Sequence, residues 1–335
     1  MKIAVAQVNP TVGDIKGNTR LIIENINKAK KSEADLVVFP ELAVTGYPPK
    51  DLLYKNKFIE LNLDAAGKIA RHTHGICAIF GFVDRKDGGI TNSAAICMDG
   101  KIVHIYDKMH LPNYDVFDEK RYFIPGEEPL VFELSGHRGY RIGITVCEDI
   151  WVENNPVCVL GERNIDLLVN ISASPFYVDK LGERIERLRR RVRESRSDAL
   201  YVNLVGGQDD LVFDGASIYM RNNGDIGFIA PQFEEGLYII DTVDTHVIEF
   251  RERSFEEQVL DALRLGLRDY VRKNGFRKVV IGLSGGIDSA LTAAIAVDAL
   301  GKENILTVSM PGKFSSDQSI SDAEQLADNL GVRLI

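Results

Sequence analysis

The sequence contains little tryptophan and cysteine, with one Trp and four Cys among 335 residues. The cysteines are Cys77, Cys97, Cys147 and Cys158. No pair has C-x-x-C spacing, which argues against a zinc knuckle and a disulfide framework. No apolar run approaches the ~20 residues needed to cross a bilayer, and Gln7 and Pro10 interrupt the N-terminus before a signal-peptide core could form. We therefore expect a cytoplasmic protein, in a reducing compartment where a thiol stays free.

The chain also lacks an excess of basic residues. It has 40 Lys and Arg against 49 Asp and Glu, a formal net charge of −9. This balance gives no support to nucleic-acid or membrane-surface binding. The most basic segment, residues 180–196, places Glu183–Arg187 and Glu186–Arg190 at i,i+4 spacing. Such pairs are typical of a solvated or subunit-facing helix, so we expect small-molecule partners, no nucleic acid and no membrane.

Strands and helices alternate along most of the chain, which favours an α/β layered fold. The expected strands are 2–8, 34–41 and 76–83, and the expected helices between and after them are 17–32 and 57–72. Hairpins are predicted at Asp99-Gly100 and Asn223-Gly224, since Asp-Gly favours a type I′ turn. We place one large domain at 1–245, a linker at 246–256 and a second α/β domain at 257–335, which starts with a helix at 255–273 and has strands at 279–283 and 303–311.

Three predicted strand ends carry reactive side chains. Glu41 ends one strand, Lys108 ends another and Cys147 ends a third. Reacting groups gather beyond the carboxyl ends of strands in α/β sheets, and these three suit acyl transfer, with a base, a cation and a thiol nucleophile. Taken singly, the same residues also fit a salt-bridged acid, a solvated lysine and a cysteine that fills the core.

The segments around these residues resemble the three signature blocks of the nitrilase superfamily. They read FPELAVTGYPPKDLL (39–53), YDKMHLPNYDVFDEKRYFIPG (106–126) and GITVCEDIW (143–151). The resemblance implies a nitrilase-like αββα sandwich that hydrolyses carbon–nitrogen bonds. It also implies that Glu41 is the general base, Lys108 the oxyanion-stabilising cation and Cys147 the nucleophile, and that Glu119 supports the lysine.

The first domain is most similar to the glutaminase half of glutamine-dependent NAD⁺ synthetases. That resemblance implies that L-glutamine is a substrate, recognised by Tyr114, Ser174 and Lys180. Lys180 and Ser174 would hold the α-carboxylate, and Tyr114 would close one wall of the pocket. Since nitrilase relatives usually assemble, the resemblance also implies a homo-oligomer. The alternative for Ser174 is a simple Ser-Pro turn.

A glycine-rich turn at 282–289, GLSGGIDS, follows the strand expected at the start of the second domain. It lacks the Lys-Ser/Thr ending of a Walker A loop. Its glycines could still let backbone N–H groups surround a phosphate at a helix N-terminus. The candidate nucleotide-binding residues are Gly282, Leu283, Ser284, Gly285, Gly286, Ile287, Asp288 and Ser289. Asp288 could cap the helix or hold Mg²⁺.

This turn resembles the PP-loop of ATP pyrophosphatases, which implies ATP and Mg²⁺ as cofactors and deamido-NAD⁺ as the acid that is adenylated. Since residues 257–335 are fewer than the ~100–150 of a usual nucleotide-binding domain, we expect only part of a Rossmann-like PP-loop domain. Two other functions stay open from the sequence, a stand-alone nitrilase-type amidase acting on another small amide and a nucleotide-binding regulatory fragment with an idle thiol.

Overall fold

The structure is a computed structural model that describes residues 1–134, 136–137, 139–244, 246–312 and 316–335. The chain forms two compact units, one made of residues 1–206 and 213–252 and the other of residues 207–212 and 253–335. No helix among the described residues is both long enough and apolar enough to cross a bilayer.

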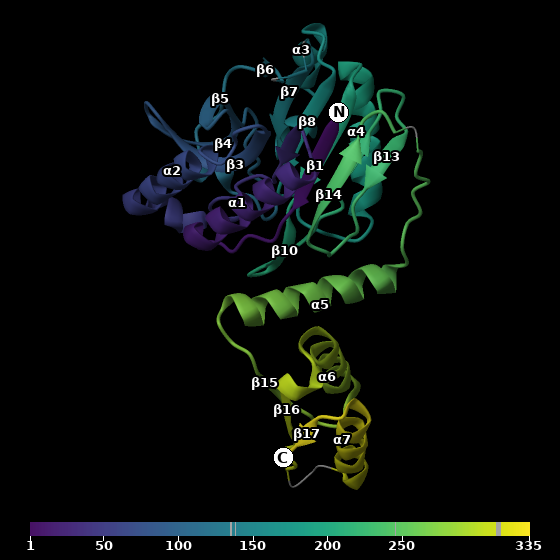
Figure 1. The fold of residues 1–335 in the computed structure, drawn as a ribbon. Coiled ribbons are helices and arrows are strands. Elements are labelled where there is room, and N and C mark those ends of the chain that lie inside the picture. Colours follow the sequence, from purple (N-terminus) through teal and green to yellow (C-terminus); the bar gives the residue numbers. More distant parts are fainter. Residues whose placement is uncertain (135, 138, 245, 313–315) are drawn as a thin grey trace. The chain divides into compact units, whose positions relative to one another are not determined.

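The first unit is built around two six-stranded sheets (Figure 1). One sheet has, in spatial order, β14 (Gly236–Asp241), β1 (Lys2–Gln7), β2 (Leu36–Val38), β3 (Cys77–Lys86), β4 (Gly89–Met98) and β5 (Lys101–Asp107). The other has β13 (Ile226–Ile229), β12 (Ile218–Met220), β9 (Asp198–Asn203), β8 (Leu167–Ser172), β7 (Arg141–Val146) and β6 (Leu130–Glu133). In each sheet three parallel strands lie in the middle and antiparallel strands flank them.

Helices cover the outer face of each sheet, which gives four layers (Figure 1). The helices are α1 (Ile15–Lys31) and α2 (Asn56–Ala70) on the first sheet, and α3 (Val157–Glu162) and α4 (Lys180–Ser195) on the second. Side chains of both sheets, such as Val38 and Ile79 on one and Val146 and Val169 on the other, share one buried cluster. Strands buried on both faces are continuously apolar, which is why β1 and β2 were readable from the sequence.

Most expected elements of the first unit are present with shifted ends. Helix α1 begins at Ile15 rather than 17, because the Asp14 carboxylate accepts a hydrogen bond from the Gly17 N–H and so caps the helix earlier. Strand β2 is shorter than expected, and the chain leaves the sheet at Phe39. The first predicted turn is confirmed as a type I′ conformation, with positive φ at both Asp99 and Gly100.

The second unit contains a small parallel sheet. Its elements are α5 (Phe255–Lys273), β15 (Val279–Gly282), α6 (Ile287–Leu300), η4 (Lys302–Asn304), β16 (Ile305–Val308), α7 (Asp317–Leu330) and β17 (Arg333–Leu334). Helix α5 has the bounds expected from the sequence, and Ser254 caps it with a reciprocal hydrogen bond to Glu257. The strand expected at 303–311 is shorter, since residues 302–304 form a 3₁₀ turn. A hairpin of β10 (Val205–Gln208) and β11 (Leu211–Asp214) contributes residues 207–212 to this unit, which the sequence did not predict.

A close backbone approach sets the position of Glu41. The turn that follows β2 lies directly on Gly81 of β3, whose N–H donates to Pro40 O. A Cβ at Gly81 would come within 2.1 Å of Leu42 N and 2.6 Å of Glu41 C. Only glycine leaves this space, so β3 and the turn that carries Glu41 are fitted together.

We expect Gly81→Ala to lower the free energy of unfolding of the first unit by about 1–3 kcal/mol, the usual effect of overpacking. Gly67→Ala is the matched control, because Gly67 lies in α2 and a methyl group there would meet no atom within 4 Å, and it should add about 0.5–1 kcal/mol. Urea unfolding followed by fluorescence measures this unit selectively, since Trp151 is the one tryptophan of the chain. Equal midpoints for the two variants would contradict the steric argument.

Candidate active site

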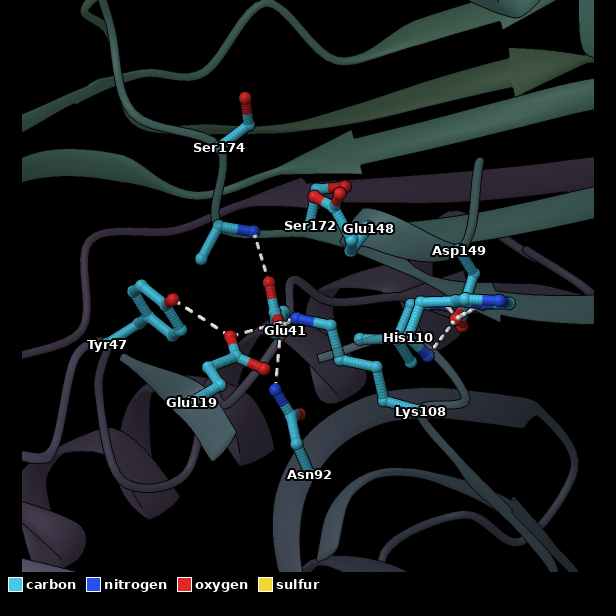
Figure 2. Close-up of polar contacts among 12 residues, drawn as sticks. Glu41, Tyr47, Asn92, Lys108, His110, Glu119, Glu148, Asp149, Ser172 and Ser174 are labelled. Carbon is cyan, nitrogen blue, oxygen red and sulfur yellow. Dashed lines mark hydrogen bonds and ion pairs between the residues drawn. The ribbon is translucent and has the colours of Figure 1, made fainter. Parts of the chain in front are cut away.

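A buried lysine between two carboxylates forms the centre of the site. Lys108 follows β5 and its Nζ donates to Glu41 Oε1 at 2.7 Å and to Glu119 Oε1 at 2.9 Å. Glu41 and Lys108 are fully buried, and Glu119, in the 3₁₀ turn η2 (Glu119–Arg121), is 4% exposed. Figure 2 shows the three side chains converging from separate segments. The sequence had suggested this pairing of Glu119 with Lys108 only through resemblance.

Two further donors hold the Glu41 carboxylate. Asn92 Nδ2 donates to Oε1 at 2.7 Å, and the backbone N–H of Ala173, just after β8, donates to Oε2 at 2.8 Å (Figure 2). Both oxygens of Glu41 are therefore engaged, one of them by the opposite sheet. A carboxylate held in this way can turn only slightly, which would suit it to proton transfer.

Cys147 begins a 3₁₀ turn, η3 (Cys147–Ile150), at the carboxyl end of β7. Its φ of 42° is in the left-handed region, which costs a non-glycine residue about 1–3 kcal/mol. The carboxylate of Asp149 stabilises this turn by accepting the Val146 N–H at 2.9 Å and the Tyr106 hydroxyl at 2.8 Å. The same carboxylate accepts the N–H groups of the two residues after Lys108 at 3.1 and 2.9 Å. Asp149 therefore joins the segment that carries the thiol to the segment that carries the lysine.

The local electrostatics keep a neutral thiol beside a permanent cation. Burial raises the pKa of Cys147 well above its usual value, the negative charge of Glu41 adds to this, and Lys108 opposes it. Burial would lower the pKa of Lys108, but the charges of Glu119 and Glu41 outweigh it and hold that pKa well above normal. The thiol therefore needs a base to ionise, and Glu41 is the carboxylate whose charge acts on it most strongly.

The first of the candidate substrate-binding residues, Tyr114, lies at the rim. Its side chain is half exposed, and its hydroxyl donates to Glu148 Oε2 at 2.8 Å. Both side chains line a cavity of about 630 Å³ that also includes His110 and Val152. Burial raises the pKa of Glu148, which Tyr114 and Lys108 counteract. Glu148 lies in the signature block at 143–151, but the sequence did not predict that it binds substrate.

Ser174 and Lys180 do not line that cavity. Ser174 is buried, its N–H donates to Asn203 Oδ1 at 2.9 Å, and Arg184 donates to its carbonyl at 2.9 Å and its hydroxyl at 3.3 Å. Lys180 is the first residue of α4, and its Nζ donates to the Tyr177 hydroxyl at 2.8 Å. Burial lowers the pKa of Lys180, and the nearby Cys147 is among the groups that oppose this shift.

The glycine-rich turn of the second unit connects β15 to α6. Ser284 and Ser289 hydroxyls lie 3.0 Å apart, and the Ser289 hydroxyl also donates to Gly286 O at 2.9 Å. Gly285 has a φ of +78°, and a Cβ there would come within 2.1 Å of Ser319 O. Hydrogen bonds of the two serine hydroxyls and the positive φ of Gly285 thus stabilise this tight turn. The turn lies at the N-terminus of a 14-residue helix.

The prediction that Asp288 could cap this helix is wrong. The N-cap residue is Gly286, no side chain caps the helix, and Asp288 lies in its first turn. The carboxylate is exposed and lies next to the turn. One carboxylate with waters and substrate phosphates is a usual Mg²⁺ environment, so the residue fits a nucleotide-bound Mg²⁺ although the described residues contain no cluster of three or more potential ligands.

Sequence comparison identifies both units. Residues 2–252 match the family described as carbon-nitrogen hydrolase. The chain belongs to the carbon-nitrogen hydrolase family. Residues 259–335 of this family member also match the family described as NAD synthase. The nitrilase-like sandwich and the second α/β unit expected from the sequence are therefore confirmed.

Relatives that are similar over nearly the whole chain are glutamine-dependent NAD⁺ synthetases. That of Thermotoga maritima is 41% identical over 99% of this chain and 64% of its own length, and that of Acinetobacter baylyi 40% identical over 99% and 61%. The solved structure from Acinetobacter baumannii, a complex with ADP, has a TM-score of 0.93 and 43% identity over 99% of this chain and 64% of its own. The chain thus spans less than two thirds of these relatives.

A simpler relative shares the first unit. An amidase of the nitrilase superfamily from Nesterenkonia, solved as a cysteine-to-alanine mutant, has a TM-score of 0.64 and 25% identity over 73% of this chain and 91% of its own. The αββα architecture of this hydrolase family member is therefore found without a second unit.

Several residues of the site were missed by sequence reasoning. These are Asn92, Ala173, Asp149, Arg184 and Tyr47, whose hydroxyl donates to Glu119 Oε1 at 2.9 Å. Asn92 and Ala173 carry no signal in the sequence, because Asn92 contacts Glu41 from another strand of the same sheet and the Ala173 N–H contacts it only when the second sheet is stacked on the first. Tyr47 and Asp149 lie inside the signature blocks, and that position was the one available clue.

The protonation of Glu119 gives a pH-dependent prediction. Burial raises its pKa to about 7, with Lys108 opposing and Glu41 adding to the shift. Because the folded pKa exceeds the unfolded value of about 4.5, the folded state holds this proton more tightly. The contribution of Glu119 to stability is then fully present below about pH 4.5 and is lost as the pH rises to about 7.

We expect the free energy of unfolding of the unaltered protein, relative to Glu119→Gln, to fall by about 3 kcal/mol between pH 4.5 and 8. Urea unfolding of both proteins across this range, monitored at Trp151, measures the difference. A difference that stays constant with pH, or that grows as pH rises, would show that Glu119 is not protonated preferentially in the folded state.

Proposed function

We propose that the chain hydrolyses L-glutamine at Cys147 and that the ammonia released serves ATP-dependent synthesis of NAD⁺ from deamido-NAD⁺. The observation that carries the first step is the buried contact of Lys108 with Glu41 and Glu119, next to a thiol on a strained turn. The second step is supported by the similarity to glutamine-dependent NAD⁺ synthetases across both units.

In the acylation step Glu41 accepts the thiol proton while the sulfur of Cys147 attacks the amide carbon of glutamine. Lys108 stabilises the oxyanion together with the backbone N–H of Glu148, which lies in the first turn of η3 and so has no intrahelical partner. Glu41 then gives the proton to the leaving nitrogen, and ammonia departs from a thioester. Water attacks the thioester, Glu41 takes one of its protons, and glutamate leaves when that proton returns to the sulfur.

Substrate recognition uses side chains from three segments around the thiol. Tyr114 closes one wall of the cavity, and the role of Ser174 and Lys180 in holding the α-carboxylate of glutamine stays a prediction, since neither residue lines that cavity. Arg184 is fully buried and forms an ion pair with Asp214 at 2.7 Å, so its hydrogen bonds to Ser174 fix that residue rather than bind substrate. The site would therefore select an amide whose α-carbon bears a charged carboxylate group.

For the ATP-dependent step, backbone N–H groups of residues 284–286 and the N-terminus of α6 would surround the pyrophosphate of ATP. Asp288 would hold Mg²⁺, which neutralises phosphate charge. The chain matches only part of its relatives' length, so we assign the residues described here to glutamine hydrolysis and pyrophosphate binding. The second unit disfavours a stand-alone amidase, and the arrangement around Cys147 disfavours an idle thiol.

The reducing cytoplasm is the compartment that suits this chemistry, since the four cysteines are free and the reaction needs a thiol. The homo-oligomer implied by the nitrilase resemblance stays a prediction.

The first test measures ammonia release from glutamine. We expect Cys147→Ala and Glu41→Gln each to lower kcat by at least about 10³-fold, because one removes the nucleophile and the other its base. Cys158→Ala is the matched control, since Cys158 is an exposed free thiol and its loss should leave the rate unchanged. Equal release by Cys147→Ala and the unaltered chain would refute the glutaminase assignment.

The second test measures binding of Mg·ATP by titration calorimetry. We expect Gly285→Ala to weaken binding about 10- to 100-fold, because a side chain at φ +78° and 2.1 Å from Ser319 O must displace the turn. Gly67→Ala, in the first unit, is the control. Circular dichroism of both variants verifies that their total helix content is unchanged, and unchanged ATP affinity in folded Gly285→Ala would contradict the role of this turn.

A further inference from the structure

The one tryptophan of the chain lies on the turn that carries the thiol. Trp151 directly follows η3, four residues after Cys147, and its backbone N–H donates to Glu148 O at 2.8 Å. Its half-buried side chain packs against the cluster formed by α3, α4 and the second sheet. The indole therefore has a fixed position relative to the thiol, and the catalytic steps above leave it without a role.

The indole face holds the ammonium of Lys180. Lys180 Nζ lies 4.0 Å from the centroid of the Trp151 ring and 4.5 Å from that of Tyr177, and it also donates to the Tyr177 hydroxyl. A second cation, Arg187, lies 5.3 Å from the Trp151 ring. Attraction between a cation and an aromatic face is substantial at these distances and grows as water is removed.

A lysine at this position is electrostatically unfavourable without such support. Lys180 is the first residue of α4, and the positive end of the helix dipole repels a cation. Burial and the nearby charge of Arg184 both act to lower its pKa, while Glu183 and Cys147 act to raise it. Its ion partner Glu183 is 3.4 Å away, with a side chain that is 53% exposed, so that pairing is screened by water.

An aromatic ring holds a cation in a way that a carboxylate does not. The ring attracts the ammonium through its quadrupole but carries no formal charge, so the cation keeps its attraction for an anion. A buried carboxylate in the same place would neutralise Lys180 and weaken its interaction with a substrate carboxylate. Two aromatic rings around one lysine thus leave its ammonium able to attract an anion.

We propose that Trp151, with Tyr177, is a positioning residue that holds Lys180 at a set distance from Cys147, so that amides with an α-carboxylate are selected. The inference rests on the proposed glutaminase function and adds to it the residue that determines where the carboxylate lies. Cys147 begins η3 and Trp151 directly follows it. This one short turn would therefore set the separation between the reacting amide and the carboxylate held by Lys180.

The test compares L-glutamine with 4-aminobutanamide, which is glutamine with hydrogen in place of the carboxylate. In the full-length chain, Trp151→Leu should lower the ratio of kcat/KM for glutamine to that for 4-aminobutanamide about tenfold, mainly through KM for glutamine. A tenfold change corresponds to about 1.4 kcal/mol, within the range for partly desolvated cation–π contacts. Trp151→Phe keeps an aromatic face and should restore most of the ratio.

A double-mutant cycle separates positioning from general packing. Lys180→Met should lower the ratio strongly, and adding Trp151→Leu to it should change the ratio less than about twofold, since the two residues act through one contact. A loss of kcat/KM in Trp151→Leu that is equal for the two amides, an unchanged ratio, or additive effects in the double variant would each overturn the proposal. If Cys147→Ala releases ammonia as fast as the unaltered chain, the proposed function fails as well, whereas Cys147-dependent release with an unchanged ratio overturns the role of Trp151 alone.

Discussion

The contact of Lys108 with two buried carboxylates is the interaction on which the rest of the first unit depends. Its members come from the ends of β2 and β5 and from η2, and the backbone after β8 completes the hydrogen bonds of Glu41. Burying these charges is costly, and removing one member of such a group leaves an uncompensated charge worth about 3–5 kcal/mol. The group therefore fixes the relative position of the two sheets at their carboxyl ends. Replacing any one of its charged residues alone would destabilise the unit.

The same arrangement gives neighbouring groups different protonation states. Lys108 stays positively charged, Cys147 stays protonated until a base acts on it, and Glu119 changes charge near neutral pH. Glu41 is left as the carboxylate that is both oriented by donors and electrostatically coupled to the thiol. Strain at Cys147 is compensated by Asp149, which hydrogen-bonds to the residue before the thiol and to those after the lysine. Order in the ground state reduces the reorganisation that the reaction requires.

Sequence patterns predicted the elements better than the contacts. Alternation of apolar strands and amphipathic helices was enough for β1, α1, α2 and α5, and Asp99-Gly100 was enough for a type I′ turn. Strand ends and three local motifs coincide at Glu41, Lys108 and Cys147, which led to the roles proposed for them, and the structure brings Lys108 into contact with Glu41. Asn92, Gly81 and Arg184 could not be predicted in the same way, since each acts on a residue that is distant in sequence or in another element. The capping role suggested for Asp288 failed because Gly286, in extended conformation, already starts the helix.

Substrate choice must come from outside the Glu41–Lys108–Cys147 centre. The Nesterenkonia amidase shares the sandwich at 25% identity, so the architecture is compatible with more than one amide. The side chains around this centre are what can distinguish an amino-acid amide, which carries charged groups, from a simple amide.

Two pairs of side chains near the thiol differ in charge. Tyr114 with Glu148 forms an acidic pair and Lys180 with Trp151 a basic one, and both Tyr114 and Lys180 lie within electrostatic reach of the thiol. An amino-acid amide carries a positive α-amino group and a negative α-carboxylate. Separate acidic and basic pairs would favour such a substrate over amides that carry one charge or none. On the proposed function, these two pairs of opposite charge would favour a substrate whose α-amino and α-carboxylate groups have the complementary arrangement.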